Sequence, residues 1–133
     1  MTLTFVDAGV LIAAARGNNK LALKAMAVLD DPDRQFVSSK FVQLEILPKA
    51  IYHKNTAEAN FYEIFFDSVH TWVAVSEKLL EEAHRLACES GLSAIDALHV
   101  AAAISVNADE LITTEKSDKP IHKILQLKTT SIT

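Results

Sequence analysis

Hydrophobic residues along this chain alternate between short continuous runs and longer stretches with helical spacing. The short runs predict strands, because a strand buried on both faces has a nearly continuous apolar sequence. We expect five strands, at residues 3–6, 35–38, 72–75, 111–114 and 125–132. The longer stretches predict helices at residues 8–15, 20–29, 41–51, 57–66, 77–89 and 93–106, and a short helix at 121–124.

Short strands separated by helices are typical of parallel α/β folds. We therefore predict an α/β protein, a three-layer α/β/α sandwich around a mainly parallel sheet of about five strands, with right-handed crossovers. The chain has 133 residues, half of them hydrophobic, which suits a single domain over residues 1–133. Ligands of such folds bind beyond the carboxyl ends of the strands, so polar residues at those ends are the first candidates for function.

The composition narrows the possible classes of protein. Three Gly and three Pro argue against linker-rich chains, and the single Cys88 cannot form an internal disulfide. No basic segment precedes an apolar run at the start and no apolar stretch could span a bilayer, so we expect a cytoplasmic protein without membrane contact. The net charge of −4 argues against a bulk electrostatic nucleic-acid binder, but not against a protein that contacts phosphates through bound metal ions.

Four acidic residues that are far apart in the sequence are expected at the carboxyl edge of the sheet. Asp7 follows the first predicted strand, and Glu115 follows the fourth. Glu45 lies in the second turn of the helix after the second strand, and Asp96 lies in the first turn of the helix that begins after Ser93. Structural roles are also available, since Asp7 suits a helix N-cap, Asp96 a capping box and Glu115 a solvated turn.

Glu45 is the hardest of the four to explain by a structural role. It lies too deep in its helix to cap it, and it stands beside the apolar stripe. Lys49, four residues later, is the available partner for an ordinary helix ion pair, so spacing alone leaves both interpretations open. Clustered carboxylates repel one another, and a cation must compensate them. Mg²⁺ and Mn²⁺ prefer carboxylate oxygen and water, so the pattern predicts a site for Mg²⁺ or Mn²⁺.

The same acidic residues lie in segments that resemble the PIN-domain ribonucleases, especially the VapC-type toxins of bacterial toxin–antitoxin pairs. The matching segments are Phe5–Ile12, Leu44 with Glu45, Ser93–Ala103 and Ala108–Glu115, and their order and spacing cover nearly the whole chain. The resemblance implies a PIN-like fold and cleavage of single-stranded RNA by a water that Mg²⁺ or Mn²⁺ activates. It also implies a small antitoxin protein as a partner, and a homodimer.

The resemblance assigns roles to the acidic residues. Asp7, Glu45 and Asp96 match the metal ligands and catalytic acids of the family. Glu115 matches a fourth acidic position, which is often Asp, although Asp118 is close enough in sequence to serve instead. The implied roles are that Asp7 and Asp96 hold the principal ion, that Glu45 binds it or orients the attacking water, and that Glu115 supports a second ion.

Two supporting residues and one departure complete this resemblance. Thr113 matches a hydroxyl residue that is often found beside the fourth acid. His99, on the same helix face as Asp96, is either a proton shuttle or a packed residue bonded to a carboxylate or carbonyl. The family commonly has Ser, Thr or Asn soon after the first Asp, whereas Ala8 and Gly9 stand here, so a site hydroxyl or amide is missing.

Two other functions fit part of the pattern. The missing polar residue keeps open a catalytically weak PIN-like module that binds RNA or protein. An Asp directly after the first strand also suits a phosphotransfer or phosphatase domain with Asp7 as the nucleophile. That function ranks last, because position 9 is Gly and the Asp-x-Asp pair of haloacid-dehalogenase-like enzymes is absent. The metal-dependent ribonuclease is the leading hypothesis.

Overall fold

The computed structural model describes all residues 1–133 and contains one five-stranded sheet. Its strands are β1 (Thr2–Val6), β2 (Arg34–Ser38), β3 (Thr71–Trp72), β4 (Glu110–Thr113) and β5 (Lys128–Ser131). Its helices are α1 (Ala8–Arg16), α2 (Lys20–Leu29), α3 (Lys40–Tyr52), α4 (Thr56–Asp67), α5 (Glu77–Ser90) and α6 (Ala94–Ser105), with a 3₁₀ helix η1 (Pro120–Lys123). Every neighbouring pair is parallel, in the order β3-β2-β1-β4-β5, which confirms the predicted α/β fold.

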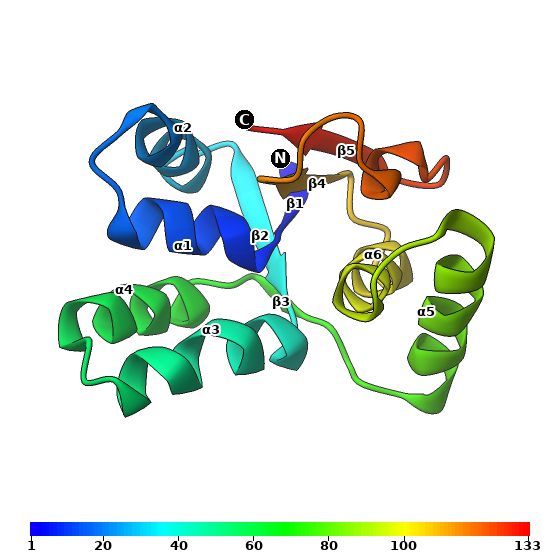
Figure 1. The fold of residues 1–133 in the computed structure, drawn as a ribbon, viewed down its shortest axis with the longest axis horizontal. Helices are drawn as coiled ribbons and strands as arrows, with labels where there is room; N and C mark the ends of the chain where they lie inside the picture. Colours follow the sequence, from blue (N-terminus) through cyan, green and yellow to red (C-terminus); the bar gives the residue numbers. More distant parts are fainter.

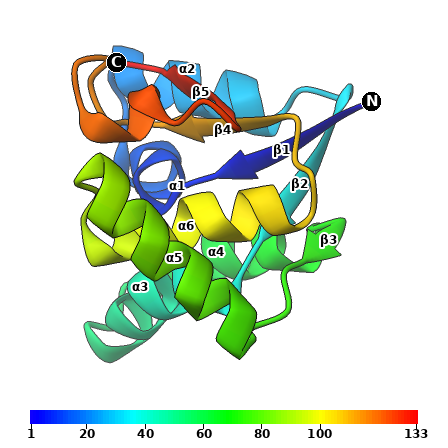
Figure 2. The same cartoon turned by 90° about the vertical axis from the view of Figure 1, so that its right-hand side faces the viewer.

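Helices cover both faces of the sheet, as the sandwich prediction requires (Figure 1). Helices α1 to α4 lie on one side of the sheet, and α5 and α6 lie on the other. The topology accounts for this division. Two crossovers carry the chain from β1 outward to β3, and the return to β4 reverses direction. Because parallel crossovers are right-handed, the helices of the return fall on the opposite face. Figure 2, viewed from the side of α5, shows α5 and α6 packed side by side.

The two central strands form the middle of the hydrophobic core. Phe5 on β1 and Leu111 on β4 are fully buried, and both belong to a single cluster of 31 buried residues. Half of the residues of α6 are buried, and most of these are Ala, whose small side chains allow close packing. The carboxyl ends of β1 and β4 and the beginning of α6 are therefore held by tightly packed elements.

Polar caps begin the helices that border the carboxyl edge of the sheet. The side chains of Asp7, Ser39 and Ser93 accept hydrogen bonds from the backbone N–H groups of Val10, Val42 and Asp96, respectively. Each bond satisfies a donor that helix geometry leaves without an intrahelical partner. Asp7 and Ser39 directly follow β1 and β2, so strand ends and helix caps coincide at this edge.

The third strand is shorter than predicted. We expected residues 72–75, whereas β3 contains only Thr71–Trp72. Its neighbour β2 ends at Ser38, because the next residue already caps α3. Beyond Trp72 only the N–H of Val73 still bonds to the carbonyl of Ser38, at 2.9 Å. The residues after it have no strand to pair with.

The fifth strand is also shorter than the predicted 125–132. It pairs only with β4, whose four residues match Lys128–Ser131 one for one. Leu125 lies before the strand and is 97% exposed. Among the helices, none is by itself both long and apolar enough to cross a bilayer. The consecutive helices α5 and α6 reach the required length and composition only when taken together, and the chain bends by 119° between them.

Candidate active site

A cavity of about 230 Å³ opens at the carboxyl edge of the sheet. The four acidic residues singled out in the sequence, Asp7, Glu45, Asp96 and Glu115, all line it. They come from the end of β1, the middle of α3, the first turn of α6 and the loop after β4. Asp118 is exposed and does not line the cavity. The structure therefore brings the four carboxylates together and leaves Asp118 outside.

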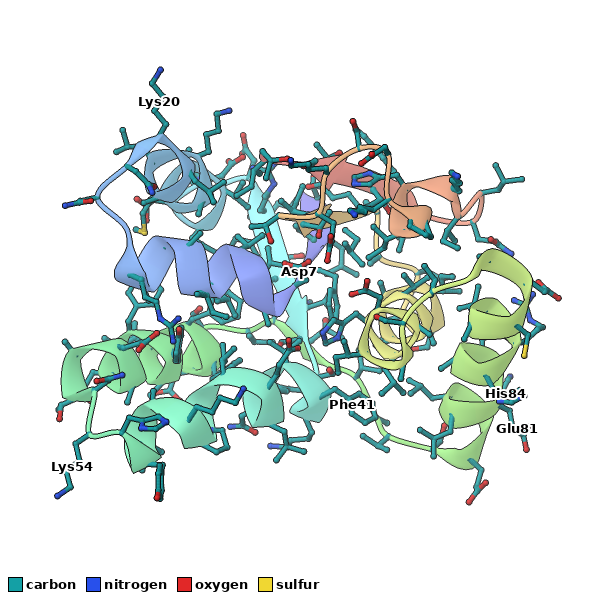
Figure 3. All side chains as sticks on the ribbon, in the orientation of Figure 1. Asp7, Lys20, Phe41, Lys54, Glu81 and His84 are labelled. Atoms are coloured by element: carbon teal, nitrogen blue, oxygen red, sulfur yellow. The ribbon has the colours of Figure 1, made fainter.

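Asp7 is the most buried of the four acids, with 6% of its surface exposed. In Figure 3 it lies near the middle of the molecule at the start of α1, whereas Lys20 points outward. Its Oδ1 accepts from the N–H of Val10 (3.1 Å), and its Oδ2 accepts from the hydroxyl of Thr113 (2.5 Å). Burial nevertheless raises the pKa of Asp7 from 3.8 to about 6, and the nearby Asp96 carboxylate acts in the same direction.

Thr113 connects two of the acidic residues. It is the last residue of β4 and is fully buried. While its hydroxyl donates to Asp7, the same oxygen accepts from the backbone N–H of Glu115, at 3.0 Å. Thr113 therefore orients the Asp7 carboxylate and fixes the backbone that leads Glu115 to the cavity.

Glu45 pairs with His99 and not with Lys49. Nε2 of His99 lies 3.1 Å from Oε1 of Glu45, and the His99 ring packs against Phe5 with centroids 5.5 Å apart. His99 is 2% exposed, and its Nδ1 is buried without a hydrogen-bond partner. A charged ring would bury an unsatisfied N–H there, whereas a neutral ring with its proton on Nε2 leaves only a lone pair unused. The geometry therefore favours neutral His99, donating to Glu45.

Asp96 and Glu115 present their carboxylates to the cavity without protein partners. The backbone N–H of Asp96 donates to the hydroxyl of Ser93 (3.3 Å), which confirms the capping half of the predicted capping box. The backbone carbonyl of Glu115 accepts from Nε2 of His122 (3.0 Å). Neither carboxylate itself receives a hydrogen bond or an ion pair, and no Lys or Arg lines the cavity, so its negative charge is largely uncompensated.

The chemistry of these donors suits a hard divalent cation. Carboxylate oxygens are the ligands that Mg²⁺ and Mn²⁺ prefer. As the side chains stand, no three of the His, Cys, Asp or Glu residues converge closely enough to hold one ion together. Mg²⁺ keeps several of its waters and needs only one or two carboxylates directly. The cavity fits such an ion if the remaining acids contact it through water.

Sequence reasoning missed one polar residue of the cavity, Thr114, and did not explain why Gly9 stands near Asp7. Thr114 follows β4 and lines the cavity. A Cβ atom on Gly9 would lie 2.1 Å from Oγ of Thr114 and 3.3 Å from Oδ1 of Asp7. The signal in the sequence was a Gly in the first turn of a helix, since Gly often marks a close approach of another group.

The family of the chain follows from a comparison with family models. The model described as PIN domain matches residues 4–119, which includes all four carboxylates of the cavity. The chain belongs to the PIN-domain family. The family resemblance seen in the sequence is thereby confirmed.

Solved structures share the fold of this PIN domain. One chain of VapBC2 from Rickettsia felis, bound to a promoter DNA fragment, is 17% identical with a TM-score of 0.74. A chain of a toxin–antitoxin complex from Klebsiella pneumoniae is 19% identical (TM-score 0.74), and one of VapBC-1 from nontypeable Haemophilus influenzae is 15% identical (TM-score 0.67). Each match covers 98% of both chains, and it confirms the predicted PIN-like fold. Among curated proteins, no match is found.

Proposed function

We propose that this PIN domain is a VapC-type endoribonuclease that cleaves single-stranded RNA with the help of Mg²⁺ or Mn²⁺. One observation carries the proposal. Four carboxylates from distant parts of the chain line one small cavity, and no Lys or Arg side chain faces them. Burying like charges without compensation is costly, so a fold that gathers them suits a cation-binding function.

Asp7 and Asp96 are the proposed principal ligands. Hydrogen bonds from Thr113 and Val10 fix the orientation of Asp7, and Asp96 carries a free carboxylate at the start of a rigid helix. When bound, Mg²⁺ or Mn²⁺ supplies an acidified water and a positive charge that offsets that of the phosphodiester. Glu115, in the loop after β4, supports a second ion or contacts the first through water.

Glu45 is proposed to orient the attacking water and accept its proton. Its Oε1 is engaged by His99, while Oε2 has no protein partner and can accept a hydrogen bond from water. A base must lie within hydrogen-bond reach of the proton that it removes, and a carboxylate fixed through one oxygen meets this need better than a freely rotating one.

A small antitoxin protein and a second copy of the chain are the proposed protein partners. The three structural neighbours described above are VapBC or toxin–antitoxin complexes. Leu44, Ile51 and Tyr52 are exposed on α3, beside an apolar groove of about 480 Å³. Exposed apolar patches are typical of protein–protein contacts, which supports a protein partner. The proposed place of action is the cytoplasm.

A second candidate is the RNA- or protein-binding module with weak or no catalysis. It is favoured by the spacing of the acidic side chains, no three of which are placed to share an ion. The phosphotransfer hypothesis gains no such support, because both oxygens of Asp7 accept hydrogen bonds within the protein and the side chain is buried.

Cleavage of labelled single-stranded RNA by the purified protein tests the proposal. We expect cleavage with Mn²⁺ and none with EDTA. Asp7→Asn and Asp96→Asn should each lower the rate about a thousandfold, the order expected when charge stabilisation at the reacting group is lost. Asp118→Asn, which changes an acid outside the cavity, is the matched control and should cleave normally.

Other outcomes identify the competing functions. Cleavage that survives EDTA, or that persists in both cavity variants, contradicts the proposed mechanism. Stabilisation by Mn²⁺ and binding of RNA without cleavage support the binding module. A covalent phosphate on Asp7 supports the phosphotransfer domain.

A further inference from the structure

One hydroxyl group in the cavity is not used by the protein itself. The hydroxyl of Thr113 donates to Asp7. Oγ of the exposed Ser93 accepts from the N–H of Asp96 at the start of α6, so it is used as an acceptor and only its hydrogen is unpaired. Thr114, half-buried at the cavity wall, takes part in no side-chain hydrogen bond. Its O–H group is therefore free to donate to a molecule that enters the cavity.

Gly9 provides the space that the Thr114 side chain occupies. A Cβ atom on Gly9 would lie 2.1 Å from Oγ and 3.3 Å from Cβ of Thr114. Gly9 sits inside α1, where only Pro is a poorer helix former, and its φ is not positive, so its backbone conformation does not require Gly. Gly is required at this position because the Thr114 side chain approaches so closely. The same point lies 3.3 Å from Oδ1 of Asp7, so the Thr114 side chain and the most buried acid both lie close to Gly9.

The cavity is rich in acceptors and poor in donors. Its four carboxylates only accept hydrogen bonds when ionised, and the Nε2–H of His99 is already used by Glu45. A phosphate is also an acceptor, and hydroxyl side chains are among the groups that hold RNA and DNA phosphates in position. A free hydroxyl beside Asp7 therefore has a chemical role that the carboxylates cannot fill.

We propose that the Thr114 hydroxyl donates a hydrogen bond to a phosphate oxygen of the RNA substrate, in place of a polar side chain at position 9. This inference rests on the proposed ribonuclease function and adds a substrate-binding residue to the same cavity. Gly9 and Thr114 act as a pair, because the first leaves room for the second.

Thr114→Val is the decisive variant, because it removes the hydroxyl at nearly constant volume. We expect kcat/KM for single-stranded RNA to fall about ten- to a hundredfold, the loss of one hydrogen bond to a charged group. Affinity for Mn²⁺, measured by calorimetric titration, should not change. Thr114→Ser keeps the hydroxyl and should retain most of the activity. Thr2→Val, at the opposite end of β1, is the matched control.

Two results overturn the inference while the ribonuclease function stands. One is cleavage by Thr114→Val at the rate of the unmodified protein. The other is a parallel fall in Mn²⁺ affinity and cleavage, which would assign the hydroxyl to the ion. If the unmodified protein binds the RNA without cleaving it, the ribonuclease function fails. In that case, fluorescence anisotropy titrations compare the RNA affinity of the unmodified protein with that of Thr114→Val. Equal affinities overturn the inference.

A double-mutant cycle tests the pairing of Gly9 with Thr114. Gly9→Ala should lower kcat/KM about as much as Thr114→Val, because the new Cβ forces the Thr114 side chain to rotate away. In a Thr114→Ala background the same change should have a much smaller effect on cleavage, because the contacts that remain, at 3.3 Å to Cβ of residue 114 and to Oδ1 of Asp7, need only a small shift. An equal effect of Gly9→Ala in both backgrounds contradicts the pairing.

Discussion

The two edges of the sheet both gather acidic residues, but only the amino edge pairs them with an arginine. At the amino edge, Oε2 of buried Glu110 accepts from the hydroxyl of Thr4 (2.7 Å) and from Nε of Arg34 (2.9 Å). Arg34 also bonds to Asp31, at 2.8 Å. At the carboxyl edge, four carboxylates share one histidine, one buried hydroxyl and the N–H groups of the backbone.

This difference separates acids that the fold itself compensates from acids that we propose to bind a cation. A buried carboxylate that has a cation and hydrogen bonds is compensated within the protein. No Lys or Arg lines the cavity, and burial, with a smaller contribution from the Asp96 carboxylate, raises the pKa of Asp7. A divalent cation that binds between the carboxylates would offset the repulsion among them. Because it binds only the folded state, it would also stabilise the fold. Variants at the two edges should therefore have opposite effects.

Glu110→Gln tests the compensated edge and should have the largest effect on stability. The substitution keeps the shape of the side chain but leaves the Arg34 guanidinium beside a neutral amide. We expect the free energy of unfolding to fall by about 2–3 kcal/mol, less than for a fully buried pair because Arg34 is partly exposed. Urea denaturation followed by circular dichroism measures the change. Cleavage per folded molecule should stay normal, and a loss of cleavage without a loss of stability contradicts the separation of the edges.

Asp7→Asn tests the uncompensated edge and should have the opposite sign. At pH 7 in EDTA, the shift of the Asp7 pKa from 3.8 to about 6 destabilises the fold, by at most about 3 kcal/mol at roughly 1.4 kcal/mol per unit. The Oδ1 of Asn can still accept from the N–H of Val10, but its amide NH₂ cannot accept from the Thr113 hydroxyl as the carboxylate does. Part of the gain in stability is therefore lost. We expect a net stabilisation of about 1–2 kcal/mol in urea denaturation, and no further stabilisation when Mn²⁺ is added.

The pH dependence of that difference identifies its cause. Well below pH 3.8 the Asp7 carboxyl is protonated in both the folded and unfolded states, and it contributes nothing. As the pH rises to about 6, the unfolded state releases this proton first, so stability is lost. The advantage of Asp7→Asn should grow across this window and level off above it. A difference that is constant with pH would point to packing or capping instead.

The convergence of the acids was predictable because local signals and topology agree. Alternating strands and helices predict a parallel sheet, and parallel strands end at the same edge. Asp7 and Glu115 were placed there by their positions directly after β1 and β4, and Asp96 by the cap at Ser93. Each of these inferences needs only a few neighbouring residues and the order of the elements.

The pairings within the cavity were not predictable, because they depend on how distant elements pack. Spacing offered Lys49 as the partner of Glu45, but the exposed Lys makes no such pair, and His99 approaches from α6. The pairing of Gly9 with Thr114 joins α1 to the loop after β4 in the same way. The lengths of β3 and β5 were also overestimated, because an edge strand ends where its neighbour ends.

His99 offers the smallest predicted effect and the sharpest test of how the cavity is organised. Leu at this position fills the space beside Phe5 and removes the unpartnered Nδ1, so His99→Leu should not lower Tm. It also removes the donor that orients Glu45. We expect kcat to fall about tenfold with little change in KM, because a misplaced base slows the reaction and not the binding of RNA.

Rescue by a second donor distinguishes orientation from packing. His99→Gln places an amide N–H where it can reach Glu45, and it should recover most of the rate that His99→Leu loses. His84→Leu, an exposed histidine on α5, is the matched control and should be unchanged. If the Leu and Gln variants lose activity equally, His99 acts through its packing against Phe5. If neither loses activity, Glu45 needs no orientation, and the uncompensated edge depends on Asp7 and Asp96 alone.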